Sequence, residues 1–497
     1  MLLERFEDRG LAQYSYAVGD EAARVVAFVD PRRDVDVYVD WAAERGFTIT
    51  DVLETHIHAD FASGARELAL RTGATLRLSA YDEDERYEVL HAHALLRDGD
   101  SVQLGAVRLQ ALHTPGHTPE HLTFLVYDGA RDRGVGAVQT VPVAALTGDF
   151  LFVGSLGRPD LLGEEAKHAL ARRLFKSVRE KLAGLPDAME VYPGHGAGSM
   201  CGAGMSNRPF STLGAERVSN PYLDPALSEE AFVERLLAAS PPLPPYYLRM
   251  KALNAAGPAL LGHLPGGLPG LAPLPVERFR ELVEAGTHVV IDVRDQLAFG
   301  GGHVPGALGL GIDGQLSTWA GWLVPYDLAD GGRGGRPTVS LLLVAADPGD
   351  VEPAVRALVR VGFDDIEGWL EGGMEAWTDR GFPVATLPQV SVGELAAQLD
   401  GATTATNGAP LTVLDVRADS EWAQGHVAGA HHLLGGHVPQ RLGEVPSGPL
   451  AVLCGGGYRS TAVASFLQRA GRHDVVNVTG GMGAWKRAGL PLSGGHR

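Results

Sequence analysis

Residues 55–64 read THIHADFASG, and this histidine-rich stretch directly follows an apolar, strand-like run that ends at Leu53. Three further polar sites follow it in order: His117 in HTPGHTPEH, Asp149 in LTGDFLF and His195 in VYPGHGAG. Each follows an apolar segment or lies in a Gly/Pro turn, where a rigid scaffold can bring ligands together. A single histidine in such a loop is usually just hydrogen-bonded, but the ordered set predicts a metal site.

The same motifs carry a family resemblance. The ordered set HxHxD, PGHT, TGD and YPGHG resembles the metallo-β-lactamase fold over nearly all of residues 1–240. The stretch TGDFLFVGSLGRPDL is similar to the persulfide dioxygenases and their glyoxalase II relatives. This resemblance implies an αββα sandwich and one Fe(II) per chain, with His56, His117 and Asp149 as ligands. Two histidines and one carboxylate would leave iron positions open for a thiol substrate and O₂.

Other motif positions are implied to support these ligands rather than to bind the metal. By resemblance, His58, Asp60 and His195 would orient the ligands and tune the site, although some of them could be ligands themselves. Asp160, in GRPD, matches a further position of the family. The alternative, that Asp160 is simply an aspartate of a surface loop, is nearly as well supported by the sequence.

Position 61 departs from the two-metal pattern of the fold, which is HxHxDH. Phe61 stands in place of the last histidine, and a phenyl ring cannot bind a metal. A second site therefore lacks a ligand, which disfavours two-zinc hydrolysis of the glyoxalase II kind. Zinc in place of iron, and with it a thioester hydrolase, remains the alternative. A third possibility is a sulfur carrier or sensor with an inactive metal site.

The second half of the chain repeats itself. VIDVRDQLAFGGGHVPGA at 290–307 matches VLDVRADSEWAQGHVAGA at 413–430, and GGMEAWTDRGFP at 372–383 matches GGMGAWKRAGLP at 480–491. Two pairs in the same order predict a duplicated α/β domain with a mainly parallel sheet. We place the copies at 274–385 and 388–493.

The region between the first domain and the duplication is rich in proline and glycine. SPPLPPYY occupies 240–247 and GPALLGHLPGGLPGLAPLP occupies 257–275. Such composition cannot sustain a helix or a central strand, so residues 241–273 are predicted to be a linker. The chain as a whole is thus expected to be an α/β multidomain protein.

The last copy contains PLAVLCGGGYRSTAVA, in which Cys454 ends an apolar strand and Ser460 opens a helix. The glycines let successive backbone N–H groups turn toward one point, and the helix N-terminus adds positive potential. This arrangement favours a persulfide anion on Cys454, and Arg459 supplies a cation. The loop resembles the active loop of rhodaneses, which implies that the residues around the thiol bind substrate: Gly455, Gly456, Gly457, Tyr458 and Ser460.

The middle copy has LLLVAADPGDVEPAV at the equivalent place. The cysteine position falls on Ala345 or Ala346, depending on a one-residue gap, and the arginine position on Asp350 or a neighbour. Because neither a nucleophile nor a cation remains, this copy is predicted to be inactive in sulfur transfer. It could be a scaffold, the wall of a channel or a dimer interface.

Cys201, in GAGSMCGAGMS, is the other of the two cysteines and follows His195 by six residues. Two interpretations are equally supported. The thiol is either a small packing residue of the loop or a group near the metal that holds or passes a sulfane sulfur.

The charge and composition of the chain limit the partners that it can be expected to bind. The net charge of -18 argues against nucleic acid, because phosphate binding needs a basic surface. The first 20 residues have no long apolar run, so neither a signal peptide nor a membrane anchor is expected, and a cytoplasmic location is the default. The fold family and the duplication suggest a homodimer or homotetramer.

These inferences combine into one predicted activity. The metal domain would oxidise a low-molecular-weight thiol persulfide with O₂ to sulfite. Cys454 would then transfer a sulfane sulfur to sulfite and so form thiosulfate, as in bacterial fusions of persulfide dioxygenase and rhodanese that this chain resembles. Such a protein would act in sulfide detoxification.

Overall fold

The computed structural model describes the chain except for residues 82–87, 130–140, 313–314, 327–338, 402–410 and 495–497. The chain divides into two compact units. The first comprises Met1–Gly267 with short later segments, and the second begins at Leu268. Among the described helices, none combines the length and the apolar character that crossing a bilayer requires.

The first unit is built on two six-stranded sheets. One has the order β1(Leu2–Asp8), β2(Gln13–Asp20), β3(Val25–Val29), β4(Thr48–Leu53), β5(Thr75–Ser79) and β6(Ala94–Leu96). The other has the order β14(Ser211–Thr212), β13(Glu190–Pro193), β10(Ala144–Gly148), β9(Leu122–Asp128), β8(Val107–His113) and β7(Ser101–Leu104). Apolar side chains of both sheets share one buried core, to which Val18, Leu53, Leu109 and Phe124 belong. This core lies between the two sheets, where it is shielded from water, and its apolar contacts hold the sheets together.

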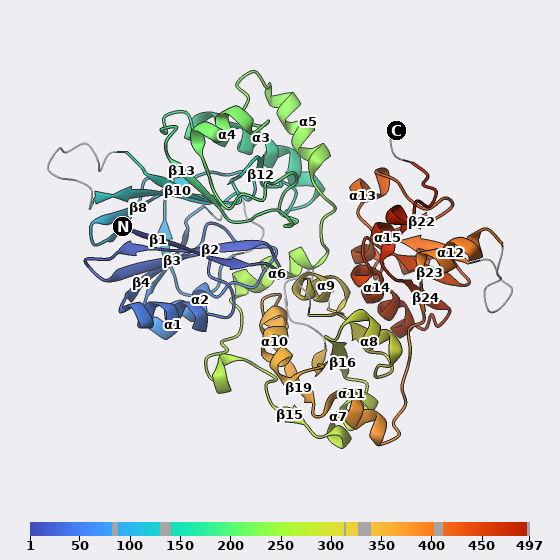
Figure 1. Cartoon of the computed structure of the whole chain (residues 1–497). Helices are drawn as coiled ribbons and strands as arrows, with labels where there is room; N and C mark the ends of the chain where they lie inside the picture. The colour runs from blue at the N-terminus through green and yellow to red at the C-terminus, as the bar shows by residue number, and fades with distance from the viewer. Residues whose placement is uncertain (82–87, 130–140, 313–314, 327–338, 402–410, 495–497) are drawn as a thin grey trace. The chain divides into compact units, whose positions relative to one another are not determined.

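Helices cover the outer faces of both sheets (Figure 1). On the first sheet, α1(Asp36–Arg45) and α2(Ala65–Thr72) bury Trp41 and Leu68 in a second core. On the second sheet, three helices form a third core: α3(Glu164–Lys181), α4(Leu213–Ser219) and α5(Glu229–Ala239). A hairpin of β11(Leu151–Phe152) and β12(Ser155–Leu156) follows β10. The helix–sheet–sheet–helix layering confirms the predicted αββα sandwich.

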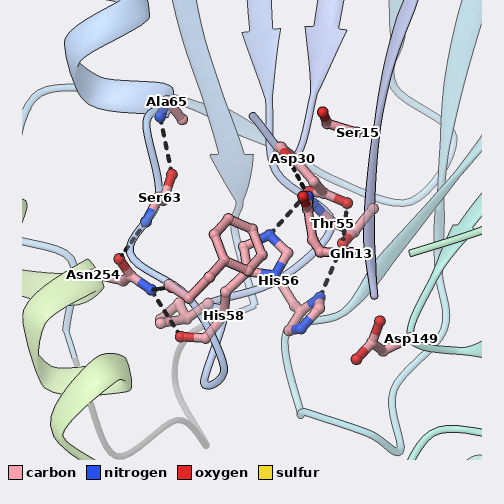
Figure 2. Close-up of polar contacts among 12 residues, drawn as sticks. Gln13, Ser15, Asp30, Thr55, His56, His58, Ser63, Ala65, Asp149 and Asn254 are labelled. Carbon is pink, nitrogen blue, oxygen red and sulfur yellow. Dashed lines mark hydrogen bonds and ion pairs between the residues drawn. The ribbon is translucent and has the colours of Figure 1, made fainter. Parts of the chain in front are cut away.

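The predicted linker contains an ordered helix, which corrects that interpretation. Helix α6 spans Tyr246–Ala256, from the last two residues of the first proline-rich patch to the start of the second, and nine of its residues are buried. The Nδ2 of Asn254 donates hydrogen bonds to the carbonyls of His58 and Phe61, at 2.8 Å each (Figure 2). Proline disfavours helix only where it stands, and YYLRMKALNAA contains none. The flanking composition concealed a helix that supports the histidine-rich loop.

The second unit contains two five-stranded parallel sheets with the same strand order. The middle copy has β15(Pro273–Leu274), β19(Ile366–Leu370), β18(Ser340–Val344), β16(His288–Asp292) and β17(Leu308–Gly309). The last copy has β20(Gln389–Val390), β24(Val475–Val478), β23(Leu450–Leu453), β21(Thr412–Asp415) and β22(His431–His432). The repeated order confirms the duplication of an α/β domain.

Helices flank each sheet. In the middle copy they are α7(Val276–Glu284), α8(Gln296–Gly301), α9(Leu316–Leu323), α10(Val351–Val359) and α11(Gly373–Asp379). In the last copy they are α12(Val392–Leu399), α13(Asp419–Ala423), α14(Tyr458–Arg469) and α15(Gly481–Arg487). Each reactive-loop position follows the central strand of its sheet, β18 or β23, at the carboxyl end of a parallel sheet, where such folds bind ligands.

Candidate metal centre and thiol site

The proposed ligands come from three separate loops at strand ends. His56 follows β4, His117 precedes β9 and Asp149 follows β10, and all three are buried. One donor atom from each lies within 4.8 Å of the others, and His117 Nε2 is 3.3 Å from Asp149 Oδ2. Figure 2 shows Asp149 approaching His56 from a different segment of chain. The fold thus brings together the predicted ligand set.

Hydrogen bonds fix which nitrogen of each histidine is free. His117 Nδ1 lies 2.8 Å from the carbonyl oxygen of Arg158, an acceptor, so this nitrogen must carry the proton. Thr55 Oγ1 donates to Asp30 at 2.9 Å, so it accepts from His56 Nδ1, also at 2.9 Å. Both imidazoles therefore keep a lone pair on Nε2, the atom that faces the other ligands.

The donor atoms that converge form no hydrogen bond with any described residue. His56 Nε2, His117 Nε2 and Asp149 Oδ2 are all buried without a hydrogen bond. Burying unsatisfied polar atoms is costly, and three such atoms turned to one point need an explanation. A divalent cation satisfies all three at once, so these residues fit a metal.

The charge states suit the same role. Burial lowers the pKa of His117 to about 4, and burial together with neighbouring His58 lowers that of His56 well below its ordinary value. Both rings are therefore neutral at pH 7. Burial alone would raise the pKa of Asp149, but His195 and His117 outweigh it and keep the carboxylate anionic. Two neutral imidazoles and one carboxylate are the protonation states that metal binding requires.

His195 is fully occupied by carboxylates. Its Nδ1 lies 2.8 Å from Asp149 Oδ1, and its Nε2 lies 2.7 Å from Asp60 Oδ2. Burial lowers the pKa of His195, but Asp149 and Asp60 raise it well above the ordinary value. A ring that donates from both nitrogens has no lone pair for a metal. In this arrangement His195 orients Asp149 and leaves Asp149 Oδ2 free.

His58 is also turned away from the converging atoms. Its Nε2 lies 3.1 Å from Asp30 Oδ1, and its ring packs against buried Phe61 with centroids 4.3 Å apart. Burial lowers the pKa of His58, but Asp30 raises it to about 9. Asp30 thus holds both His58 and, through Thr55, His56 (Figure 2). Sequence reasoning missed Asp30 because it follows β3 outside any histidine motif.

Asp160 is connected to the proposed ligand His117 only through Arg158. Both its oxygens pair with Arg158, at 2.6 and 2.8 Å. The backbone carbonyl of Arg158 is the acceptor that fixes His117. Arg158 is buried, so the GRPD motif contributes chiefly through this arginine. The sequence motif GRPD contains Arg158, but the predicted site did not include this arginine.

His121 is a third residue that the sequence motifs did not single out. Its Nε2 accepts a hydrogen bond from the backbone N–H of Asp149 at 3.1 Å, and its ring stacks on His56 with centroids 5.2 Å apart. It lies in HTPGHTPEH, four residues after His117. The motif contained the signal, but only the tertiary structure gives this histidine a role in holding a ligand.

Cys201 lies in a buried environment beside the same centre. Burial raises the pKa of its thiol well above the ordinary value, and Asp60 raises it further. The Sγ is 3.8 Å from the hydroxyl of Tyr247, and the carbonyl of Cys201 accepts from the N–H of Arg158 at 2.8 Å. A protonated thiol is a weak nucleophile. Cys201, Asp60 and His195 also form a second cluster of donor atoms, within 4.8 Å of one another.

Cys454 occupies the turn between β23 and α14, and the loop around it is directed at its sulfur. The N–H of Gly457 donates to Sγ at 3.0 Å and the hydroxyl of Ser460 at 3.4 Å. The carbonyls of Cys454 and Gly455 accept from the N–H groups of Met482 and Gly483, at 2.7 and 2.9 Å. The repeated GGMGAW motif therefore fixes the backbone of the loop.

The remaining loop residues have different surroundings. Arg459 forms a two-fold ion pair with Glu421, at 2.6 and 2.8 Å, so its charge is held in place and partly neutralised. The hydroxyl of Tyr458 bonds to the carbonyl of Gly311 at 3.0 Å rather than to the thiol. Gly456, Tyr458 and Arg459 line one cavity together with Cys454.

Strand pairing decides which alanine replaces the cysteine in the middle copy. Asp415 pairs with Leu453 and Asp292 pairs with Val344, so the residue after each strand is equivalent. Ala345 therefore corresponds to Cys454, which resolves the one-residue gap, and Asp350 corresponds to Arg459. Within the described residues, the middle copy presents no thiol at this position.

Comparisons with known proteins agree with this architecture. Residues 11–130 match the model of the metallo-beta-lactamase superfamily, and residues 275–380 and 391–488 match that of the rhodanese-like domain. The mitochondrial persulfide dioxygenase ETHE1 of Bos taurus is 30% identical over 240 residues, which are 47% of this chain and 79% of that protein. A probable metallo-hydrolase of Burkholderia pseudomallei is 29% identical over 261 residues, with 47% and 84% covered.

One solved structure extends the likeness into the second unit. A metallo-beta-lactamase from Staphylococcus aureus subsp. aureus COL aligns with a TM-score of 0.60 and 32% identity. The alignment covers 74% of this chain and 98% of the other. Because the first unit makes up little more than half of the chain, the shared fold reaches beyond the metal domain.

Proposed function

The chain belongs to the metallo-beta-lactamase superfamily, among relatives of the persulfide dioxygenases, and carries two rhodanese-like domains; from this premise we propose that it couples persulfide oxidation to sulfur transfer. The first reaction is RSSH + O₂ + H₂O → RSH + SO₃²⁻ + 2H⁺. In the second, the Cys454 thiolate attacks the outer sulfur of another RSSH and releases RS⁻. Sulfite then attacks the outer sulfur of Cys454–SSH, which forms thiosulfate and returns the thiolate.

The observation that carries the first half is the set of three orphaned donor atoms on His56, His117 and Asp149. Two imidazoles and one carboxylate are the facial set of non-heme Fe(II) oxygenases, so we propose one Fe(II) at this place. When bound there, iron would supply the redox chemistry that lets O₂ react with a persulfide sulfur. His195 holds Asp149, and the Arg158 carbonyl and Thr55 hold the two histidines.

The second half follows from the loop around Cys454. The N–H of Gly457 and the hydroxyl of Ser460 already point at the sulfur, and α14 directs its positive end toward the same place. These groups would stabilise an anionic persulfide on Cys454. Covalent tethering of the two sites would raise the effective concentration of sulfite at Cys454 and limit its escape.

The test of the dioxygenase half is metal loading followed by oxygen uptake. Protein purified anaerobically and supplied with Fe(II) should bind about one iron per chain and consume O₂ with glutathione persulfide. His56→Gln should lose both iron and oxygen uptake, whereas His168→Gln, an exposed histidine on α3, should retain them. Iron-loaded wild type that takes up no O₂ would refute the assignment.

A zinc hydrolase is the second candidate, and the Asp60, His195 and Cys201 cluster is the observation that favours it. A second ion there would need His195 to give up one of its carboxylate partners. The occupied nitrogens of His195 and the phenyl ring of Phe61 count against it. About two zinc ions per chain together with thioester hydrolysis would establish this function instead.

The role of Cys201 is open to a direct experiment. Its protonated, buried thiol favours the packing interpretation over sulfur relay. If it only packs, a Cys201→Ser enzyme should oxidise persulfide and form thiosulfate at wild-type rates. A selective loss of thiosulfate, with sulfite accumulating, would favour the relay.

A further inference from the structure

The cavity at Cys454 is built by both rhodanese-like copies, which lie in one compact unit. The last copy contributes the thiol loop, and the middle copy contributes residues from the C-terminal ends of β16 and β17 and the segments that follow them. The lining residues from the middle copy include Arg294, Gln296, Gly311 and Gln315. A catalytically inactive domain therefore forms one wall of the active site.

Packing contacts and hydrogen bonds hold the two copies together. Gly309 N–H donates to Ser465 Oγ at 3.0 Å, and Arg469 donates to the carbonyl of Gly306 at 2.8 Å. Gly436 lies directly against the ring of Trp322, leaving no room for even a β-carbon. Such close packing allows the middle copy to hold a substrate in a fixed position relative to Cys454.

The cavity has a volume of about 530 Å³, which is in the range of sites for organic ligands. Sulfite and thiosulfate have only four or five heavy atoms, so most of this space would be empty with either ion. The two arginines that line it are already paired, Arg459 with Glu421 and Arg294 with Asp292. With both arginines paired and Asp295 also in the lining, the cavity offers volume and polar groups rather than a strong positive field for a small dianion.

Gln296 supplies the most specific feature. Its Oε1 is buried and has no hydrogen-bond partner, and it lies so close to Gly457 that a β-carbon there would collide with it. Gly457 is the residue whose N–H binds the Cys454 sulfur. A buried amide oxygen beside the loop that binds the Cys454 sulfur is an acceptor without a donor, which a bound substrate can provide.

We propose that the middle copy is the substrate-binding wall of the Cys454 site, and that Gln296 accepts a hydrogen bond from an N–H of an organic persulfide donor. This inference rests on the proposed function and specifies its sulfur donor as an amide- or amine-bearing low-molecular-weight persulfide. The sulfur transfer is unchanged: the thiolate attacks the outer sulfur, the S–S bond of the donor breaks and RS⁻ leaves. The inactive copy then has a role beyond scaffolding.

The test compares two donors on the full-length chain under anaerobic conditions. Glutathione persulfide carries N–H groups, whereas thiosulfate carries none. Loading of Cys454 is followed after rapid quenching and alkylation from the mass of the tryptic peptide 442–459, which contains this cysteine. Gln296→Leu keeps the shape of the side chain and removes the acceptor, and Gln424→Leu makes the same change at an exposed position outside the cavity.

We expect Gln296→Leu to slow loading from glutathione persulfide about tenfold and to leave loading from thiosulfate within twofold, while Gln424→Leu changes neither. Equal slowing with both donors would mean that Gln296 only supports the loop, and an unchanged rate with both would mean that it has no role; either result overturns the inference alone. If wild type accepts sulfur from neither donor, the sulfurtransferase assignment falls and the inference falls with it.

Discussion

The middle and last rhodanese-like copies share their framework and differ at one turn. Each has a buried aspartate two residues before an arginine that it binds with both oxygens, Asp292 with Arg294 and Asp415 with Arg417. Each also has a tryptophan in its last helix whose indole N–H donates to the carbonyl of a proline beyond that helix, at 2.8 and 2.9 Å. The residues that the two copies share in sequence are therefore residues that stabilise the domain fold.

The turn after the central strand, β18 or β23, is different. In the last copy, the N–H of Gly457 donates to the sulfur of Cys454. In the middle copy, Pro348 stands at the position of Gly457 and has no N–H, and the N–H of the next residue, Gly349, donates to the carboxylate of Asp347 at 2.7 Å. The middle copy therefore lacks the donor that binds the Cys454 sulfur in the last copy. The two copies differ in the groups that sulfur transfer would need, while the framework that they share does not involve this turn.

The largest effect is expected from removing the thiol. Cys454→Ser should reduce thiosulfate formation at least about 1,000-fold, because no other described group at this loop can carry the sulfur covalently. Oxygen uptake and sulfite release should stay within about twofold of wild type. Both products are measured in the same reaction with glutathione persulfide. Equal loss of sulfite and thiosulfate would show that the two halves are not separable.

The framework should respond equally in both copies. Asp292→Ala and Asp415→Ala each leave a mostly buried arginine without its carboxylate, so each should lower local stability by about 3 kcal/mol. Hydrogen exchange of peptides from β16 and β21 reads each copy separately. Asp400→Ala, at an exposed position, is the control. If only one of the two strands loses protection, the copies do not share the framework that their sequences suggest.

A smaller effect is expected from Arg459, the cation of the loop around Cys454. The pair of Glu421 and Arg459 is missing from the middle copy, where Ala298 and Asp350 stand at the equivalent positions. Glu421→Gln should slow sulfur transfer about threefold to tenfold by freeing the Arg459 side chain. The partly exposed pair should contribute only about 0.5–1 kcal/mol to stability.

The pH dependence of this pair has a defined sign. Burial raises the pKa of Glu421, but the hydrogen bond from Arg459 outweighs it and leaves the pKa below its ordinary value of 4.5. The stabilisation is therefore fully present above about pH 4.5 and is lost as the pH falls through the lowered pKa. Wild type and Glu421→Gln should converge in their urea midpoints below that pH. The midpoint is read from exposure of Cys454 to a disulfide reagent that reacts in acid, and a constant difference would contradict the assignment.

The smallest expected change is a negative result. Ala345→Cys in a Cys454→Ser background should restore no more than about 1% of sulfur transfer, because Pro348, at the position of Gly457, has no N–H to donate to the sulfur. Adding Pro348→Gly restores that donor and should allow weak loading, detected by mass. Substantial transfer by Ala345→Cys alone would show that the cysteine, and not the turn, is what the middle copy lacks.

Motifs in the sequence were enough to predict the sandwich and the duplication, and they singled out His56, His117 and Asp149, whose side chains the fold brings together. They were not enough for α6, because the prolines and glycines on either side dominated the composition of 241–273. Nor could they assign Asp30 or Arg158, which act on the ligands through hydrogen bonds across the fold. Their partners are 25 and 41 residues away, and no local pattern records such a pairing.

The sequence by itself determined which chemical groups this protein can use: a cysteine in a glycine turn, histidines after strand ends, and alanine where a second cysteine would be. These are properties of residues and their immediate neighbours. Only the tertiary structure decided which atoms of those groups are free. Burial and long-range hydrogen bonds set the imidazole tautomers, strand register matched Ala345 to Cys454, and packing of the copies placed Gln296 beside Gly457.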